Sequence, residues 1–435
     1  MNPPGHDHDA HDAIPDHRRL GRQLALFASD ELVGAGLPLW LPDGAVLREQ
    51  LERFIVELER SAGGQRVYSP VLGKRELYER SGHRQHFRDD MFPPMDIGDE
   101  QLVLRPSNCP HHILIYKAVH HSFRDMPVRL CELGTMFRRE RSGVVGGLSR
   151  VRAMTLNDAH IFVTPDGVAS EVASALQLLQ HAYGVLGLSD HWLRLSLRGP
   201  GGRYVDKPRM WGRAEETLRK VLADAGVAWD EAPDEAAFYG PKVDVQIRDA
   251  RGREETLSTV QVDFHLPEVF DLSYQTASGD RQRPVLIHRS LISTMERLVA
   301  HLIERYRGAF PVWLAPVHVL ILPIGDDHVS AANQLRAVAE AATLRAQVLE
   351  PRASLGARIR RGQERMVPFM AVIGDRELAD GTVAVRRRDG RQLPPMSHAA
   401  IVDLAAGLSA ARVTGLDAPR ATVGVGGSNT GRDRS

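Results

Sequence analysis

A short segment, residues 136–162 (MFRRERSGVVGGLSRVRAMTLNDAHIF), contains the side chains best suited to chemistry. Arg138 and Glu140 precede a glycine-rich reversal, and two further arginines follow it. The segment ends in Asp158 and His160, a pair able to hold a metal ion or an amine. A guanidinium donates hydrogen bonds in parallel pairs, which suits phosphates and carboxylates. The segment therefore predicts an enzyme that activates a carboxylate with ATP.

Two runs of strand-forming residues flank the glycine-rich part, which predicts a hairpin with a long loop. Helical periodicity is expected over residues 20–26, and again after Asp43, a candidate N-cap. A strand is expected over 67–71. Between residues 101 and 310, clustered β-like runs favour an α+β fold with an antiparallel sheet. The expected strands are 102–105, 128–133, 193–196, 243–247, 259–266 and 285–288.

The composition changes after Phe310. Residues 311–316 resemble a linker, and after them strands and helices alternate, which predicts a small α/β domain. Its expected strands are 317–323, 346–349, 367–374 and 383–387, with helices at 326–342, 355–365 and 397–408. The domain limits are therefore 16–310 and 311–412, between disordered tails at 1–15, which is rich in His and Asp, and at 413–435.

The overall composition excludes several classes of protein. The net charge is zero over 435 residues, so any nucleic-acid site must be a local basic patch. No apolar run reaches the length of a membrane span, and the N-terminus lacks a signal-peptide core. The two cysteines make no disulfide framework, which fits the reducing cytoplasm.

Three residues form a candidate metal site. Cys109, His160 and His288, considered singly, are each more typical of packed residues than of ligands. Together, one cysteine and two histidines from separate strands would leave one open position on a tetrahedral zinc ion. They lie far apart in the chain, so their spacing alone does not link them.

Four other positions allow both an ordinary and a functional interpretation. Arg297 is either a solvated helix arginine or a group held against a triphosphate. Lys242 follows a Gly-Pro turn that also carries Tyr239, and Gln261 alternates with apolar residues on a strand with one face toward a pocket.

The C-terminal domain has a local excess of positive charge. From 345 to 391 there are 11 arginines against 6 acidic residues, which suits either a solvated face or an RNA partner.

Taken together, these motifs resemble the threonyl-tRNA synthetases, which are class II aminoacyl-tRNA synthetases. The resemblance extends over most of the chain, from about residue 16 to 408. It is carried by RSGH, NCP, FRRE, SRVR, DAHIF, AFYGPK, TVQVDF, IHR, MER and VIGDRE, in that order. It implies an antiparallel catalytic domain followed by an anticodon-binding domain.

The resemblance also implies roles in binding ATP. Arg138 would contact the α-phosphate and the amino-acid carboxylate, and Glu140 would receive the adenine amino group. Arg297 would lie over the adenine and touch the γ-phosphate. Mg²⁺ would accompany ATP, and the product of the first step would be an aminoacyl-adenylate with release of pyrophosphate.

For the amino acid, the resemblance makes Cys109, His160 and His288 the ligands of one zinc ion per subunit. Asp158 would accept a hydrogen bond from the threonine hydroxyl. The residues Tyr239, Gln261 and Lys242 would lie at or near the substrate, and His83 near the acceptor end of tRNA.

The implied partners are ATP, L-threonine and tRNA(Thr), in a cytoplasmic homodimer that contacts its second copy around Pro70. Arg386, Arg387 and Arg388 would contact the anticodon. Relatives usually also have an N-terminal domain and an editing domain, and this sequence begins almost at the catalytic core. We therefore expect serine mischarging unless a separate protein hydrolyses seryl-tRNA.

The sequence departs from the family pattern in the walls of the expected pocket. Leu156 replaces a usual glutamine, Ser107 a usual methionine and Thr256 a usual glutamine. Ser258 and Ser293 replace usual glycines, and Gly146 replaces a histidine of bacterial relatives. They affect the expected rate, inhibitor sensitivity and amino-acid choice.

Two alternatives stay open at this point. One is a paralogue that activates threonine or serine for a non-tRNA acceptor such as a carrier protein. The other is a non-catalytic tRNA-binding regulator. The anticodon-like domain argues against the first, and the retained ATP arginines and zinc ligands argue against the second.

Overall fold

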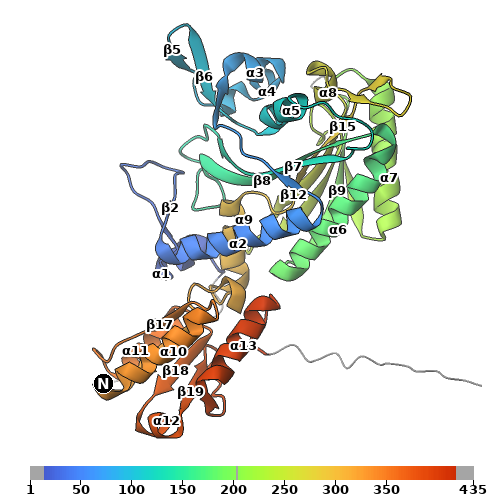
Figure 1. Ribbon diagram of the computed structural model, residues 1–435. Coiled ribbons are helices and arrows are strands. Elements are labelled where there is room, and N and C mark those ends of the chain that lie inside the picture. Colours follow the sequence, from blue (N-terminus) through green and yellow to red (C-terminus); the bar gives the residue numbers. More distant parts are fainter. Residues whose placement is uncertain (1–13, 202–203, 418–435) are drawn as a thin grey trace, which may run out of the picture. The chain divides into compact units, whose positions relative to one another are not determined.

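The computed structural model describes residues 14–201 and 204–417, and the chain divides into two compact units, residues 1–310 and 311–435 (Figure 1). The two expected disordered tails, 1–15 and 413–435, lie mostly outside the described residues.

The main element of the first unit is a large, mostly antiparallel sheet. Among the described residues it has eight strands in the order β10-β9-β11-β12-β15-β8-β7-β3, with only the β10–β9 and β3–β7 pairs parallel. The expectation of an α+β fold with an antiparallel sheet is confirmed. The strands are β3 (Gln65–Arg66), β7 (Val128–Phe137), β8 (Ala153–Val163), β9 (His191–Leu197), β10 (Trp229–Pro233), β11 (Lys242–Arg248), β12 (Glu254–Asp263) and β15 (Val285–Ser290).

Helices cover both faces of this sheet. Figure 1 shows α5 (Cys109–Lys117) above the sheet in that view, and α2 (Pro42–Ser61) and α9 (Met295–Tyr306) below it. The apolar face expected after Asp43 is buried in α2, where Leu47, Leu51 and Phe54 are at most 1% exposed. The remaining helices are α1 (His17–Gln23), α3 (Arg75–Arg80), α4 (His83–Phe87), α6 (Val168–Leu186), α7 (Pro208–Ala225) and α8 (Leu266–Val269).

Short strands form three smaller sheets in the first unit. β4 (Leu72–Lys74) and β5 (Met95–Ile97) pair antiparallel with the central β6 (Glu100–Leu104). The other two are hairpins, β1 (Phe27–Ala28) with β2 (Leu39–Trp40), and β13 (Tyr274–Gln275) with β14 (Arg281–Gln282).

Two local expectations for the first unit are wrong. Residues 67–71 form no strand, since the chain pairs only at β3 and β4 on either side, and Pro70 has no N–H to donate to a ladder. Asp43 is not an N-cap: α2 begins at Pro42, with Leu41 as its N-cap, because proline suits the first helical position. Asp43 instead lies in the first turn, where its charge complements the helix dipole.

The second unit is a small α/β domain, as expected. Its described strands follow the order β17-β16-β18-β19-β20, and β16 is parallel to both of its neighbours. All five residues of β16 are buried, as is usual for a strand covered on both faces. The elements are β16 (Val319–Pro323), α10 (Val329–Ala341), β17 (Ala346–Val348), α11 (Leu355–Glu364), β18 (Phe369–Ile373), α12 (Asp375–Asp380), β19 (Thr382–Arg387), β20 (Met396–Ser397) and α13 (His398–Ala410).

The expected linker at 311–316 is not an exposed connection. Val312, Trp313 and Leu314 form a 3-10 turn, and all three are buried. Val312 belongs to the apolar core of the second unit together with Val319 and Ile401. The prolines suggested a linker, but the apolar residues between them make this segment part of the core.

Two further observations concern the whole described chain. Among the described residues, no helix combines the length and the apolar composition that crossing a bilayer requires. Cys109 and Cys131 are both buried and both unpaired with another cysteine.

One buried histidine should make the second unit sensitive to acid. His318 is 1% exposed, and its Nδ1 accepts the backbone N–H of Arg345 at 3.2 Å. Burial, and then the charge of Arg345, lower the pKa of His318 to about 3. The unfolded chain therefore binds one more proton than the folded chain between about pH 3 and 6.5, so stability is full above this window and falls as the pH decreases through it.

We expect His318→Gln to reduce the acid sensitivity of unfolding. At about pH 5.5 the wild-type histidine should cost about 1.4 kcal/mol of unfolding free energy relative to neutral pH. Urea titrations at both pH values measure this difference, with His181→Gln, at an exposed position of α6, as the control. Equal acid sensitivity of the wild type and the His318 variant would contradict the assignment.

Candidate active site

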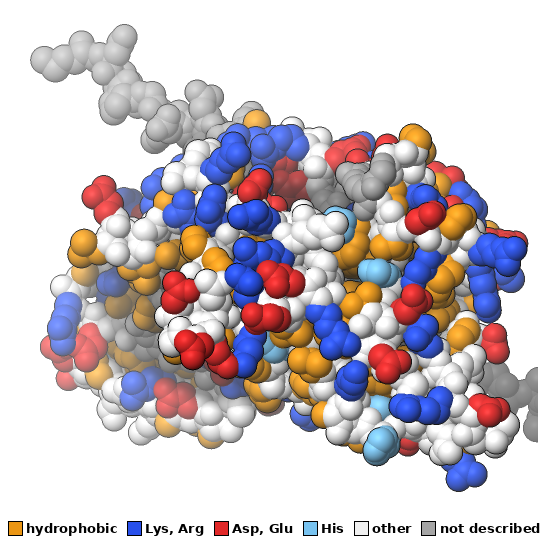
Figure 2. Space-filling view, turned by 90° about the horizontal axis from the view of Figure 1, so that it is seen from above, with side chains coloured by type: hydrophobic (Ala, Val, Ile, Leu, Met, Phe, Trp, Pro, Cys, Tyr) orange, Lys and Arg blue, Asp and Glu red, His pale blue; other side chains and the backbone are white. Residues whose placement is uncertain are grey.

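A cavity of about 500 Å³ opens on one face of the large sheet. Nine of the candidate site residues line it, although they come from distant parts of the chain. They are His83, Cys109, Arg138, Glu140, Asp158, Tyr239, Gln261, His288 and Arg297. In Figure 2, basic and acidic side chains lie next to one another over the face seen from above, so the whole face does not carry charge of one sign.

The register of the sheet brings the two candidate metal-binding histidines together. β8 and β15 are antiparallel neighbours, and His160 lies directly opposite His288. On the other side of β15, Gln261 of β12 lies opposite His288. Asp158 is two residues before His160, and alternate residues of a strand point to the same face. These four side chains therefore share one face of the sheet.

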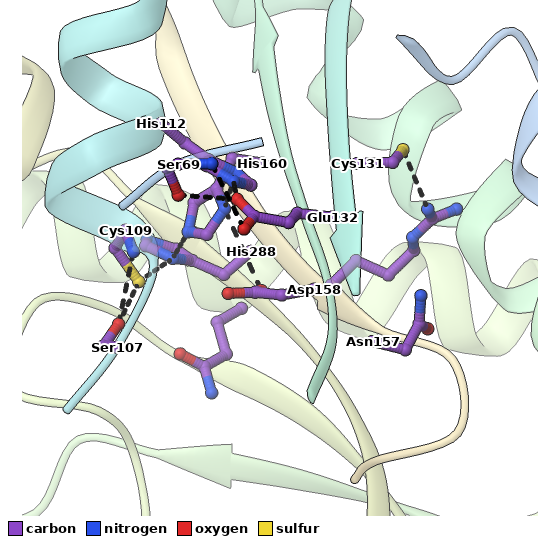
Figure 3. Close-up of polar contacts among 12 residues, drawn as sticks. Ser69, Ser107, Cys109, His112, Cys131, Glu132, Asn157, Asp158, His160 and His288 are labelled. Carbon is purple, nitrogen blue, oxygen red and sulfur yellow. Dashed lines mark hydrogen bonds and ion pairs between the residues drawn. The ribbon is translucent and has the colours of Figure 1, made fainter. Parts of the chain in front are cut away.

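Cys109 completes the group from a helix. It is the first residue of α5, and its Sγ lies 3.3 Å from Nδ1 of His288. That nitrogen lies 3.0 Å from Nε2 of His160. The three candidate ligand atoms all lie within 4.8 Å of one another, and all three residues are buried (Figure 3).

This donor set fits a zinc ion. One thiolate and two imidazoles are typical zinc ligands, and three protein ligands leave the fourth position open to a substrate. His288 is also held from its far side, where Nε2 lies 2.9 Å from Oδ2 of Asp263. A carboxylate at the second ring nitrogen directs the first nitrogen toward a metal.

Tyr239 and Gln261 form one wall beside this group. The Tyr239 hydroxyl donates to Oε1 of Gln261, and its ring stacks on that of His288 with centroids 4.9 Å apart. The hydrogen bond and the stacking together fix the Tyr239 ring. Asp158 is 5% exposed and lies on the sheet face beside the candidate metal group.

The other end of the cavity holds two arginines without a matching carboxylate. Among the described residues, no acidic side chain lies within ion-pair distance of Arg138 or Arg297. Arg297 donates instead to the backbone oxygen of Thr256 at 3.2 Å. Arg138 is exposed on the cavity wall and Arg297 is partly exposed. Two cations without a carboxylate partner at one end of a cavity suit an anionic ligand such as a polyphosphate.

The arginines are placed by the expected hairpin and by a helix start. Residues 138–152 connect β7 to β8, and the Arg138 N–H donates to the backbone oxygen of Arg152 at 2.9 Å. Glu140 pairs with Arg150 at 2.9 Å across this loop. Arg297 lies in the first turn of α9, where its N–H is capped by Oγ1 of Thr294 at 3.1 Å.

Five of the six departures from the family pattern line the cavity, all except Gly146: Ser107, Leu156, Thr256, Ser258 and Ser293. The Ser258 hydroxyl donates to the backbone oxygen of Leu291 at 2.6 Å, which ties β12 to the turn that precedes α9. Ser293 has a left-handed backbone, with φ of 64°. These side chains therefore shape the wall, and the Ser107 hydroxyl also lies 2.8 Å from Sγ of the candidate ligand Cys109.

Three further candidate residues lie in different surroundings. Lys242 lies opposite Gln261 in the sheet but does not line the cavity, because its ammonium donates to Oδ2 of Asp244 at 2.6 Å. His160 lies behind the cavity wall and is fully buried. His83 lines the cavity, where burial lowers its pKa to about 4 and leaves the imidazole neutral at pH 7.

The three arginines expected at an anticodon lie at the end of β19 in the second unit. Arg387 is buried and pairs with Asp389 at 2.7 Å and with Asp417 at 2.6 Å. Arg386 precedes it on the opposite face of β19. Arg388 follows the end of the strand, where its Nη1 donates to the backbone oxygen of Met366 at 3.4 Å. Both are partly exposed, so Arg387 is the least accessible of the three.

Sequence reasoning missed one residue of this site, His112. It lies three positions after Cys109 on α5, and residues at this spacing share a helix face. Its Nδ1 lies 2.9 Å from Nδ1 of His160. The spacing Cys-x-x-His at a helix start was the available signal, but α5 itself was not expected from the sequence.

Comparison with known proteins identifies the family of this chain. Residues 92–306 match the family described as "tRNA synthetase class II core domain (G, H, P, S and T)", and residues 318–407 match "Anticodon binding domain". The chain is 49% identical over 391 residues to a threonine–tRNA ligase of Anoxybacillus flavithermus and 50% identical over 385 residues to that of a Geobacillus strain. These alignments cover 89% and 88% of the chain, which spans about three-fifths of each relative's length, 61% and 60%.

Comparison with solved structures supports the same family. A crystal structure titled as the RNA-binding domain of threonyl-tRNA synthetase from Cryptosporidium parvum superposes with a TM-score of 0.86 at 33% identity, covering 92% of this chain and all of that one. A putative threonyl-tRNA synthetase from Aeropyrum pernix has a TM-score of 0.76 at 24% identity, over 91% of this chain and 97% of that one, which supports the fold alone.

The candidate metal site makes a direct prediction about zinc content. Removing one of three protein ligands should lower the bound zinc of the purified protein from about one ion per chain to near zero. We expect this loss for Cys109→Ala, measured by elemental analysis after dialysis. Cys131→Ala is the matched control, because Cys131 is equally buried but its Sγ donates to Glu59 at 2.9 Å. Equal zinc in both variants would contradict the assignment.

Proposed function

Because the chain belongs to the threonyl-tRNA synthetase family of class II aminoacyl-tRNA synthetases, we propose that it activates L-threonine with ATP and transfers it to tRNA(Thr). The observation that carries this proposal is the arrangement inside one cavity. Two unmatched arginines lie at one end, and a Cys-His-His group beside a carboxylate lies at the other. A site with this arrangement can hold a triphosphate and a hydroxylated amino acid side by side.

In the first step the threonine carboxylate attacks the α-phosphorus, and pyrophosphate leaves. Arg138 would contact the α-phosphate and the attacking carboxylate, while Arg297 holds the outer phosphates and the adenine. The negative charge that develops in the transition state is then met by groups already in position, which is the main source of catalysis in such reactions. Mg²⁺ bound with ATP would add to this positive charge.

Glu140 would receive the adenine amino group. One carboxylate oxygen, Oε2, already accepts from the Arg150 guanidinium at 2.9 Å. A carboxylate has two accepting oxygens, so the second one can accept from the amino group while the pair with Arg150 stays in place.

We assign Cys109, His160 and His288 as the ligands of one zinc ion. When bound, zinc supplies a Lewis-acid centre at which the amino and hydroxyl groups of threonine can bind. Asp158 would accept the hydroxyl hydrogen bond, and Tyr239 with Gln261 would border the side chain. Valine has no hydroxyl and would leave Asp158 unpaired, so the site should reject it.

Serine should be rejected much less well. It has the hydroxyl and lacks only one methyl group, which is worth about 1–3 kcal/mol in a binding pocket. Correction of seryl-tRNA therefore requires a hydrolytic site other than this cavity. We propose that a separate protein can supply that hydrolysis in trans.

The second step joins threonine to the terminal ribose of tRNA. We propose that the neutral imidazole of His83, on the cavity wall, lies near the acceptor end. Residues 16–310 would be the catalytic domain and 311–412 the anticodon-binding domain, a division supported by the two compact units and the two matched regions. Within the second domain we now assign the anticodon contact to Arg386 and Arg388. Arg387 instead holds two aspartates.

We propose a homodimer that forms around the segment near Pro70, where Tyr68 is 77% exposed. We also propose a cytoplasmic location, which is supported by the two buried thiols without a disulfide. The carrier-protein alternative has no use for a region that matches an anticodon-binding domain. A regulator without catalysis has no use for the two unmatched arginines in the cavity.

The reaction and its substrate are tested by pyrophosphate exchange, followed by charging of tRNA(Thr). Threonine should support exchange, serine should be weaker by about 10- to 200-fold, and valine by about 10,000-fold or more. Absence of exchange with every amino acid would contradict the proposed enzyme. Exchange without tRNA charging would favour a different acceptor.

The role of Arg297 has its own test. Arg297→Gln should reduce kcat/KM for ATP by about 100-fold or more, because it removes the guanidinium charge that stabilises the negative charge of the transition state. Arg305→Gln is the matched control, since Arg305 lies on the same helix but is exposed and pairs with Asp190 at 3.1 Å. A similar small effect in both variants would remove Arg297 from the proposed mechanism.

A further inference from the structure

Behind the candidate zinc ligand His160 lies a second, fully buried histidine. Nδ1 of His112 is 2.9 Å from Nδ1 of His160, and the two rings meet edge to face with centroids 4.7 Å apart. Both residues have no measurable exposure. Figure 3 shows the two rings side by side, between α5 and the sheet.

A third residue, Glu132, determines which nitrogens of the two histidines carry hydrogens. Nε2 of His112 lies 2.9 Å from Oε2 of Glu132. A carboxylate only accepts hydrogen bonds, so this nitrogen carries a hydrogen. In a neutral imidazole the other nitrogen, Nδ1, then has the lone pair. It can only accept, and the donor that faces it is the Nδ1–H of His160.

One consequence concerns the metal. If Nδ1 of His160 carries the hydrogen, its Nε2 carries the lone pair. This Nε2 is the atom that lies 3.0 Å from Nδ1 of His288, inside the Cys-His-His group. The neighbours of His160 therefore select the tautomer that a metal requires.

Glu132 is itself held firmly, which makes the chain of hydrogen bonds rigid. Its Oε1 accepts from Nη2 of Arg105 at 3.1 Å, and its Oε2 accepts from the Ser69 hydroxyl at 2.6 Å. Arg105 is 1% exposed and also donates to that hydroxyl oxygen, at 2.6 Å. With these donors in place, the carboxylate cannot rotate away from His112 without leaving a buried charge unpaired.

α5 connects the two sides of the candidate metal group. Cys109 and His112 lie three residues apart, on one face of the helix. A single turn of α5 thus provides the candidate ligand Cys109 and, in His112, the side chain that contacts the candidate ligand His160. His288 is oriented differently, by direct contact between its ring and the Asp263 carboxylate at 2.9 Å.

We propose that His112, held by Glu132, is a positioning residue that fixes the tautomer and the ring orientation of His160 for metal binding. This inference rests on the proposed zinc site. Partners at the second nitrogen of a metal-binding histidine commonly change metal affinity by about 10- to 100-fold when removed.

Two substitutions separate the two hydrogen bonds of His112. In His112→Asn, the amide oxygen can replace Nδ1 and accept from His160, but the side chain is too short to reach Glu132. In His112→Gln, the amide N–H can replace Nε2 and reach Glu132, but no acceptor is left for His160. The adjacent His111→Asn is the matched control, since His111 is also buried on α5 but faces the backbone oxygen of Leu72 at 3.4 Å.

The zinc affinity of the full chain is measured by competition with a chromophoric chelator. We expect a loss of about 10- to 100-fold for His112→Gln, and only a few-fold loss for His112→Asn. His111→Asn should bind as the wild type does. The absorption spectrum of the Co²⁺-loaded protein provides a second readout, because it responds to the geometry of the ligands; it should change for Gln and stay close to wild type for Asn.

Several results would overturn the inference and leave the zinc site itself intact. Wild-type affinity in His112→Gln is one, and equal losses in the Asn and Gln variants are another, since the effect would then be one of packing. If the wild type binds no zinc, the proposed metal site fails as well, and the two failures are thereby distinguished.

A third measurement is made on the wild type and uses a variant only to assign one signal. In ¹⁵N-histidine NMR spectra of the zinc-loaded protein, His112 should be the tautomer with its hydrogen on Nε2. The tautomer with the hydrogen on Nδ1 would overturn the inference. The His112 signal is assigned by its absence from the spectrum of whichever His112 variant folds.

Discussion

The antiparallel pairing of β8 with β15 is the constraint on which the site depends. It places His160 directly opposite His288 and fixes which face of the sheet both imidazoles occupy. A slip of one residue would turn one of them to the opposite face. Everything else in the cavity is arranged relative to this pair: Asp158 two residues earlier on β8, Gln261 across from His288 on β12, and Cys109 at the start of the helix above.

The second requirement is that positive charge be kept available at one end of the cavity. About half of the described arginines in the first unit pair with acidic side chains, as Arg289 does with Glu59 and Arg105 with Glu132. Arg138 and Arg297 do not, and the repulsion between their like charges is unfavourable until an anion binds. The cavity thus keeps two cations available for an anionic ligand.

Much of the fold and of the candidate site could be predicted from the sequence, because local sequence patterns indicate local structure. Alternation marked the strands, the glycine-rich hairpin was evident, and ordered motifs identified the family. What failed had physical causes outside the local pattern. Residues 67–71 looked like a strand, but Pro70 removes a donor; residues 311–316 looked exposed, but tertiary packing buries them. The contact between His112 and Glu132 links residues 20 positions apart, and only the folded sheet shows that they meet behind a third residue.

The left-handed backbone at Ser293 has a consequence for how this cavity can vary. Its N–H donates to the Ser290 hydroxyl at 3.1 Å, and its carbonyl accepts from the N–H of Asn157 at 3.1 Å, so the strained conformation is imposed from both sides. A side chain other than glycine costs about 1–2 kcal/mol there. Glycine would relieve the strain and remove a hydroxymethyl group from the wall. Backbone stability and the shape of the cavity wall are therefore coupled at this one position, since a change that relaxes the backbone also enlarges the cavity.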